Sequence, residues 1–422
     1  MRGIIVGRTH CISRDMSFSA LRSTQVVLLP SNKFAEKQCR KMHSSELPQG
    51  RGGRSSFSGV SATVFGGYGF VGRAVTNHLG AVGSAVMLPY RGTFERVQRL
   101  RLMADLGQFQ FRENFTINQT DDEIRELIEH SNCVVNLIGA REPFNFYTMD
   151  EVNLDWPKRL ARLVAEKGDG TRLVHLTHLN CTQEMGRDMS CLLRQNYDAE
   201  NAMREIYPET TIVRSSNIYG HGDYFTFLYL HKRMNTSLSK LGAFPLMYDA
   251  GRSTVIQPVF VSDVAEGITR ILRHPDAPGH TFEFVGEGRY VLSDFIEFLF
   301  KCANTKSYLY DTIGPLDRSK ATILQEAVHK LLELYFLRQT MPTPFIPRFL
   351  DFLMRQGGKK GMWMTFDHFK QLHLTDQTQG LPGLRELGIV PAETEEKIFD
   401  FVGCNVRSYQ MIPGKIPRVR CK

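Results

Sequence analysis

Nowhere in its 422 residues does this chain carry an unbroken apolar run of the about 20 residues that a helix needs to cross a bilayer. A spanning helix is therefore excluded, and we expect any membrane contact to be peripheral. Its eight cysteines include no CxxC pair and are spread from Cys11 to Cys421. This spacing excludes a zinc cage and a disulfide-stabilised scaffold, and it fits a reducing compartment.

Acidic residues are scarce in one place only, the N-terminus. The chain has 52 Lys and Arg against 44 Asp and Glu, and residues 1–57 hold ten of the basic residues but three of the acidic ones. The rest of the chain is therefore nearly neutral, which argues against nucleic acid as a partner. A basic, Ser-rich and acid-poor N-terminus is typical of a mitochondrial presequence, with a disordered basic tail as the alternative.

The Gly/Ser/Arg-rich stretch GRGGRSSFSG at residues 50–59 has the composition of a linker. We therefore predict a presequence and linker over residues 1–55, a nucleotide-binding domain over 56–300 and a mostly helical C-terminal region over 301–422. The last region contains a helical apolar pattern at 319–339. It is followed at 341–363 by prolines and large apolar residues among cations. Such a stretch is suited either to a membrane interface or to packing on its own domain.

Short apolar runs alternate with amphipathic helical stretches from Val60 onward. The runs are SATVF, SAVMLPY, QFQF, CVVNLIG, RLVHLTH and TTIVRSS. Between them lie stretches such as DDEIRELIEHS and LDWPKRLARLVAEKG. Buried strands that alternate with helices indicate βαβ units. The fold class is therefore α/β, with a doubly wound, parallel Rossmann sheet.

A glycine triplet follows the first of these strands. Gly66, Gly69 and Gly72 form GxxGxxG between SATVF and a helical stretch. The first glycine permits a tight turn, the second lets the backbone approach a pyrophosphate, and the third lets helix and strand pack closely. The positive end of the helix then faces the diphosphate. In this context the triplet predicts a dinucleotide site.

The second strand ends in LPYRG, about where an NAD-binding protein places an acidic residue on the ribose hydroxyls. Arg91 stands there instead. A guanidinium cannot accept a hydrogen bond but suits a 2′-phosphate, so we expect NADP(H), with a solvated loop arginine as the alternative. Strand ends at CVVNLIG and VHLTHLN complete the predicted site. The predicted cofactor-binding residues are Gly66, Tyr68, Gly69, Phe70, Val71, Gly72, Arg91, Leu137, Ile138, Gly139 and Thr177.

These features resemble the extended, atypical short-chain dehydrogenase/reductase (SDR) family, whose catalytic Tyr has a Lys four residues later. None of the 14 tyrosines here has that lysine. Aligned on the helix after VHLTHLN, the Tyr and Lys positions fall on Leu192 and Asn196, and the Ser position on Thr177 or His178. Leucine cannot donate a proton and asparagine carries no charge. We therefore predict no catalytic residues and no enzymatic activity.

Two possible substitutes do not change this prediction. Tyr197 lies outside the helical stripe of Leu192, so we do not expect it to replace the missing acid. His175 and His178 are three residues apart on a strand and point to opposite faces, so we interpret them as structural and predict no metal site.

The resemblance is closer to one group, the SDR-like, NADPH-binding accessory subunits of mitochondrial respiratory complex I. It covers the chain from residue 53, through LPYRG and QPVFVSDVAEGI, to the late HLTD and LPGLRELGI. The resemblance implies tightly bound, structural NADPH and a peripheral place on the matrix side of the mitochondrial inner membrane. Other complex I subunits near the quinone site and lipid headgroups would be its partners. It also implies a role in assembly and in stabilising the junction between the peripheral and membrane arms.

Two other functions stay open from the sequence. One is an active NADP-dependent reductase or epimerase with a displaced acid/base. The other is RNA binding, known among atypical SDRs, which the nearly neutral charge after residue 57 disfavours.

Overall fold

The computed structural model describes residues 52–141, 146–182, 190–230, 251–302 and 366–403. Its main sheet has seven strands, all parallel, in the order β10-β6-β5-β4-β1-β2-β3. The strands are β1 (Ser61–Phe65), β2 (Ala85–Pro89), β3 (Phe109–Arg112), β4 (Cys133–Asn136), β5 (Arg172–His178), β6 (Thr211–Ser215) and β10 (Thr281–Phe284). The six strands predicted from apolar runs are therefore confirmed.

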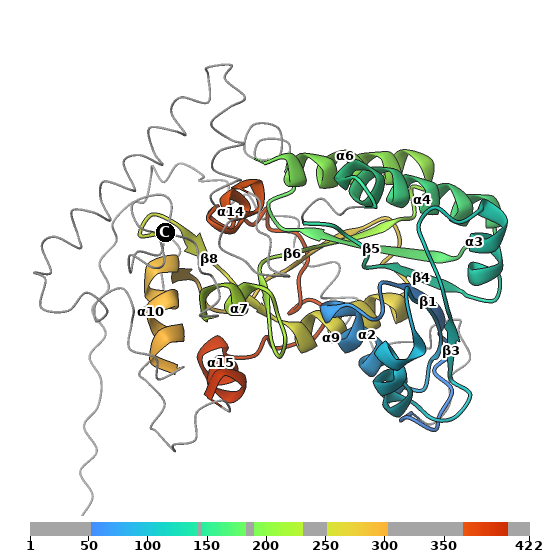
Figure 1. Ribbon diagram of the computed structural model, residues 1–422, viewed down its shortest axis with the longest axis horizontal. Coiled ribbons are helices and arrows are strands. Elements are labelled where there is room, and N and C mark those ends of the chain that lie inside the picture. Colours follow the sequence, from blue (N-terminus) through green and yellow to red (C-terminus); the bar gives the residue numbers. More distant parts are fainter. Residues whose placement is uncertain (1–51, 142–145, 183–189, 231–250, 303–365, 404–422) are drawn as a thin grey trace, which may run out of the picture.

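Helices cover both faces of this sheet (Figure 1). One face carries α3 (Asp121–Ile128), α4 (Trp156–Lys167) and α6 (Cys191–Ile206), and the other carries α2 (Phe70–Ala81) and α9 (Val261–Arg273). The predicted doubly wound Rossmann arrangement is confirmed. The strand order reverses between β1 and β4, and ligands of such sheets bind at the carboxyl ends of the strands beside this reversal.

Local sequence explains why these elements form where they do. Every residue of β4 is buried, as its apolar run requires of a strand covered on both faces. Helix α3 begins with a capping box, in which the Thr120 hydroxyl accepts from the N–H of Glu123 and the Glu123 carboxylate accepts from the N–H of Thr120. Helix α4 ends at Gly168, whose φ of 67° is left-handed.

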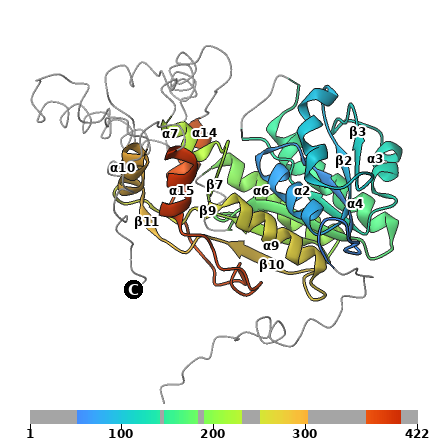
Figure 2. The same ribbon diagram turned by 90° about the horizontal axis from the view of Figure 1, so that it is seen from below.

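A second apolar cluster lies beyond one end of the main sheet (Figures 1 and 2). Its core includes Tyr219, Tyr290, Phe295 and Ile398, all at 0% exposure. The short strands around it are β7 (Ile218–Tyr219), β8 (Val255–Ile256), β9 (Val259–Phe260) and β11 (Tyr290–Val291). The helices around it are α7 (Phe225–Leu230), α10 (Leu292–Cys302), α14 (Phe366–Leu372) and α15 (Thr394–Gly403). The short helix η3 (Glu151–Asp155) instead packs against α4 and α6.

Between α14 and α15, the described C-terminal residues return to the main sheet. Leu384, Leu387 and Ile389 belong to the same core as the strands β1 and β2. The N–H of Glu283 in β10 donates to the Pro382 carbonyl at 2.9 Å. Residues 382–389 therefore pack against the nucleotide-binding fold.

The predicted boundary at residue 300 stays a prediction, because the segments 319–339 and 341–363 lie outside the described residues. In the part of the chain that the structure describes, no helix has the length and apolar character that crossing a membrane requires.

Candidate nucleotide site

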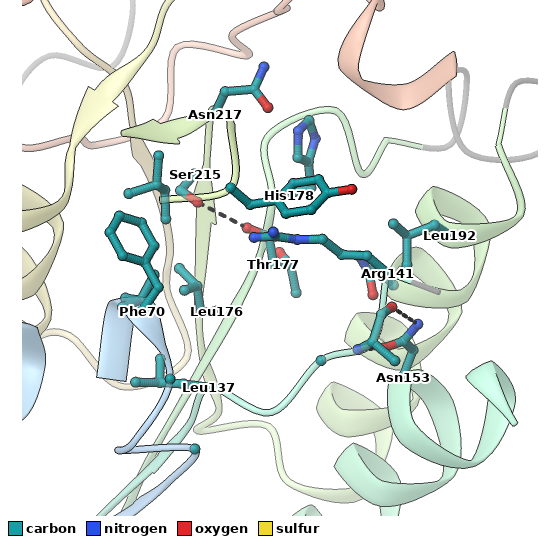
Figure 3. Close-up of a pocket in the computed structure, with 18 of the residues that line it drawn as sticks. Phe70, Leu137, Arg141, Asn153, Leu176, Thr177, His178, Leu192, Ser215 and Asn217 are labelled. Carbon is teal, nitrogen blue, oxygen red and sulfur yellow. Dashed lines mark hydrogen bonds between the residues drawn. The ribbon is translucent and has the colours of Figure 1, made fainter. Parts of the chain in front are cut away.

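A pocket of about 490 Å³ opens at the carboxyl ends of the strands, beside the reversal between β1 and β4. It contains most of the residues that the sequence predicted for the cofactor: Gly66, Gly69, Phe70, Val71, Gly72, Leu137, Ile138, Gly139 and Thr177. Figure 3 shows Phe70 and Leu137 on one side of the pocket and Leu192 and Asn153 on the other. The motif spacing and the strand ends thus converge on one place.

The glycine loop has no room for side chains at two positions. Gly66 has a left-handed φ of 82°, and a Cβ there would lie 3.0 Å from the Leu137 carbonyl carbon. A Cβ at Gly72 would lie 2.1 Å from the carbonyl oxygen of Gly66. The backbone of this loop is therefore packed tightly between β4 and the start of α2, as a phosphate-binding turn requires.

The N-terminus of α2 carries features that suit an anion. Gly69 is its N-cap residue, no side chain caps the helix, and its first turn contains no acidic residue. The first N–H groups of a helix and its dipole attract negative charge. The residues present therefore fit the diphosphate of a dinucleotide.

A buried network holds the end of β4 in place. The Asn136 carboxamide oxygen accepts from the indole N–H of Trp156 at 3.1 Å and from the N–H of Ile138 at 3.2 Å. Its Nδ2 lies 3.0 Å from Nδ1 of His175. Burial lowers the pKa of His175 to about 4, against the opposing effect of a hydrogen bond to the Asn136 backbone. His175 therefore serves as a neutral hydrogen-bonding residue that fixes the strand end under the pocket.

Asn153, which the sequence reasoning missed, anchors the turn after β4. Its carboxamide accepts from the N–H of Ala140 and donates to the Ala140 carbonyl, both at 2.8 Å, and it also donates to Gln195 at 3.2 Å. This two-point bond holds Gly139 and Ala140 where a ribose or nicotinamide would pass.

The structure brings Leu192 and Asn196 to the same pocket as the glycine loop. Leu192 is 4% exposed. Its N–H and that of Cys191 donate to the Asp367 carboxylate at 3.1 and 2.9 Å, so a residue of α14 caps α6. The described lining contains one tyrosine, Tyr224, and no lysine. Among the described residues, no three His, Cys, Asp or Glu side chains gather as metal ligands would.

The hydroxyl of Thr177, one of the two residues predicted for the Ser position, is bound to a buried carboxylate. It donates to Oε1 of Glu200 at 2.6 Å, and Glu200 is 1% exposed. Its neighbour His178 also lines the pocket. Tyr197, weighed as a substitute for the missing acid, is not among the lining residues.

Two predicted cofactor residues do not line the pocket. Tyr68 is 42% exposed, and Arg91 is exposed just beyond the end of β2. The strand β2 lies next to β1, and Arg91 follows its carboxyl end. The adenine ribose of a dinucleotide would lie near this position. The 2′-phosphate role of Arg91 therefore stays a prediction.

The far end of the pocket was not predicted from the sequence. It is lined by Arg141, Tyr224, His368 and Gln371, from three separate segments. The Arg141 guanidinium lies 5.2 Å from the centre of the Tyr224 ring, which stacks on His368 with centroids 5.1 Å apart. No sequence pattern indicated this group, because its members are up to 230 positions apart in the chain.

Comparison with known proteins gives a consistent set of relatives. The chain is 34% identical to the mouse protein named NADH dehydrogenase (ubiquinone) 1 alpha subcomplex subunit 9, mitochondrial, over 388 residues, 92% of this chain and 91% of the mouse chain. The rat protein of the same name is 33% identical over the same share. The Neurospora crassa mitochondrial NADH-ubiquinone oxidoreductase 40 kDa subunit is 30% identical over 249 residues, 59% of this chain and 62% of that protein.

Solved structures with similar folds include a dTDP-glucose 4,6-dehydratase from Bacillus anthracis in complex with NAD. It has a TM-score of 0.45 and 18% identity, and the match covers 58% of this chain and 82% of that chain. A UDP-glucuronic acid 4-epimerase from Bacillus cereus has a TM-score of 0.47 and 16% identity, with 58% and 84% covered. No model of a known protein family matches the chain.

Proposed function

The chain belongs to the family of NADH dehydrogenase (ubiquinone) 1 alpha subcomplex subunit 9 proteins, and we propose that it is an accessory subunit of complex I that binds NADPH structurally, without catalysis. One observation carries the proposal: the glycine loop and the positions Leu192 and Asn196 line the same pocket. The pocket would therefore hold a dinucleotide, but Leu192 and Asn196 replace the tyrosine and lysine that would transfer a proton.

Binding of NADPH is supported by the loop and by Arg91. The closely packed Gly66 and Gly72 and the N-terminus of α2 would hold the diphosphate. Arg91, at the end of β2, would hold the 2′-phosphate that distinguishes NADPH from NADH. When bound, NADPH would supply a hydride donor, whereas the residues of this chain would bind and orient it.

The absence of catalysis is supported by the chemistry of the lining. Loss of a positioned acid/base typically removes a factor of about 10² to 10⁴ in rate. Leu192 has no titratable proton, and the side chain of Asn196 cannot supply the charge that lowers the pKa of a tyrosine. The nucleotide then acts on stability: ligand at a thousandfold excess over its dissociation constant adds about 4 kcal/mol.

The place of the subunit is part of the same proposal. We infer a peripheral position on the matrix side of the mitochondrial inner membrane, at the junction of the peripheral and membrane arms near the quinone site, with a role in assembly. Neighbouring complex I subunits would be its protein partners. The cation-rich stretch at 341–363, which lies outside the described residues, would contact lipid headgroups.

Native mass spectrometry tests this proposal on the complex and on the isolated full chain. We expect one NADPH per chain, and loss of the subunit from the complex when the nucleotide is removed. A nucleotide-free chain within an intact complex would contradict the structural role.

The alternative, an active reductase or epimerase, makes a different prediction. Tyr224 is the tyrosine in the described lining, so it would have to act as the acid. Incubation of the NADPH-loaded chain with a panel of sugar and isoprenoid carbonyl compounds would then show NADPH oxidation that is lost in Tyr224→Phe. We expect no oxidation in either protein.

A further inference from the structure

The connection between β2 and β3 (residues 90–108) exposes two leucines. Leu102, in the short helix η2 (Gln98–Met103), is 80% exposed, and Leu106, in the turn that follows, is 98% exposed. Four positions separate them, so their Cα atoms lie at most about 14 Å apart. Leu100 of the same helix, by contrast, is buried in the core of the main sheet. The two exposed leucines add nothing to that core, and apolar side chains that gather on a surface typically mark a contact with a partner.

The same connection carries more positive than negative charge. It contains four arginines, all exposed, and two acidic residues, Glu95 and Asp105. The helix η2 contains Arg99 and Arg101 but no Asp or Glu. The Arg101 guanidinium lies over the Phe94 ring, 5.6 Å from its centre, a cation–π contact that orients this charge on the surface. A partner that complements η2 would therefore carry carboxylates beside apolar side chains.

The strand β3 is an open edge of the main sheet. It is the last strand in the order, and among the described residues it pairs with β2 alone. The opposite edge strand, β10, is covered by the returning C-terminal residues, since the N–H of Glu283 donates to the Pro382 carbonyl at 2.9 Å. Figure 2 shows β3 on the side of the molecule opposite α10 and α15. An open strand edge is a template for pairing with a strand of another chain.

The backbone of β3 directs hydrogen-bonding groups toward this open edge. The N–H of Tyr90 donates to the Arg112 carbonyl at 3.0 Å, so Arg112 and, two positions earlier, Gln110 face β2. Successive residues of a parallel strand bond to opposite sides, and the N–H and C=O groups of Phe109 and Phe111 therefore point away from β2. A further strand placed beside β3 would bond to these groups.

The charge and the strand edge together select one kind of occupant. Residues 1–57 of the chain hold ten basic and three acidic residues, so they would repel η2. A second copy of the chain would bring two positive surfaces together. An anionic lipid surface would attract the arginines, but its hydrocarbon would leave the N–H and C=O groups of the edge without partners. An acidic polypeptide in extended conformation matches both features.

We propose that β3 and the connection that bears Leu102, Leu106, Arg99 and Arg101 form a docking surface for an acidic, extended segment of another protein. The segment would add a strand beside β3, place apolar side chains against the two leucines and bring carboxylates to the two arginines. None of these four side chains lines the nucleotide pocket. The inference rests on the proposed function only for the expectation that the partner is another complex I subunit.

Photocrosslinking of the full chain in the cells that produce it tests this surface. The probe is the side chain of Leu102→p-benzoylphenylalanine, and mass spectrometry of the digest identifies what it captures. We expect a polypeptide adduct, with the crosslink in a segment that has Asp or Glu beside apolar residues. Arg99→Glu combined with Arg101→Glu should lower the adduct yield at least about tenfold, because like charges would then face each other. Arg194→Glu, an exposed arginine on α6, should leave the yield unchanged. Thermal midpoints check that each variant is folded.

The outcomes separate the two proposals. The docking surface is overturned by a crosslink to lipid, to a second copy of the chain or to a segment without acidic residues. It is also overturned by the lack of an adduct, or by an equal yield in the charge-reversed variant, and the proposed function then stays intact. A crosslink to an acidic segment of a protein outside complex I supports the docking surface and overturns the proposed place of the chain in that complex.

Discussion

The Glu200 carboxylate and the Arg214 guanidinium form a buried, two-point ion pair behind the pocket. Oε2 of Glu200 accepts from Nε and Nη2 of Arg214 at 3.1 and 2.7 Å, and the side chains are 1% and 9% exposed. Oε1 also accepts from the Thr177 hydroxyl, and Nη1 of Arg214 donates to Gln379 at 2.8 Å. The pair thus connects the floor of the pocket to the C-terminal segment.

Replacing Arg214 by Met should destabilise the fold strongly. Glu200 would be left buried without its counter-charge, which typically costs about 3–5 kcal/mol. Chemical denaturation measures this loss. The matched control is Arg112→Gln, whose partner Glu126 is 63% exposed and 3.4 Å away, so its removal should cost under about 1 kcal/mol. Equal effects of the two changes would show that the buried pair does not stabilise the fold.

Alanine substitutions at two glycines of the pocket should differ in their effect on stability and on NADPH retention. Gly72→Ala should lower stability and abolish NADPH retention, since its Cβ would lie 2.1 Å from a backbone oxygen that cannot move aside. Gly139→Ala should fold normally, because the nearest atom to its Cβ is 3.8 Å away. Thermal unfolding and mass spectrometry of both variants give the comparison. A Gly72→Ala protein with normal stability and nucleotide content would contradict the close packing.

Arg91 should set the choice between NADPH and NADH. In Arg91→Asp the carboxylate would accept from the ribose hydroxyls and repel the 2′-phosphate, so NADPH affinity should fall about 10- to 100-fold and NADH affinity should rise. Fluorescence titrations with both nucleotides measure the ratio. Arg194→Asp serves as a control for net charge. An unchanged ratio in Arg91→Asp would identify Arg91 as a solvated loop residue.

His175 should make the protein less stable in acid. Burial lowers its folded pKa to about 4 from 6.5, so the unfolded chain binds a proton that the folded chain does not between these values. Stability from this group is full above pH 6.5 and falls by about 3 kcal/mol toward pH 4. Denaturant unfolding from pH 7.5 to 4.5 measures the slope. In His175→Gln, the slope of the unfolding free energy against pH should decrease by the equivalent of up to one proton. An unchanged slope would show that His175 does not cause the loss of stability in acid.

Asp376 should have the opposite effect on pH dependence, because it makes the protein less stable as the pH rises. Its carboxyl is 2% exposed, and Oδ2 accepts from the N–H of Gln257 at 2.7 Å. Burial raises its pKa to about 7, opposed by that hydrogen bond and by the charge of Arg289. The folded state therefore holds the proton more tightly, and stability is lost as pH rises from 3.8 through 7. Asp376→Asn should raise the thermal midpoint at pH 8 and change little at pH 4. A lower midpoint at pH 8 would show that the ionised carboxylate is needed.

Much of the pocket could be predicted from local sequence. Apolar runs identified six of the seven strands of the main sheet, all but β10, and the spacing of Gly66, Gly69 and Gly72 placed a loop after β1. The helix α6 could be aligned closely enough to put Leu192 and Asn196 in the pocket. These features depend on periodicity and on neighbours within about twenty positions, which the chain order encodes directly.

Only the tertiary structure showed how distant segments complete the site. Arg141, Tyr224 and His368 meet although up to 227 positions separate them, and Asp367 caps a helix that begins at Cys191. The Glu200–Arg214 pair likewise depends on the C-terminal segment that returns to β6 through Gln379. Such contacts arise when the chain packs its segments to bury apolar surface and satisfy buried charges, and no spacing in the sequence specifies which distant side chains then become neighbours.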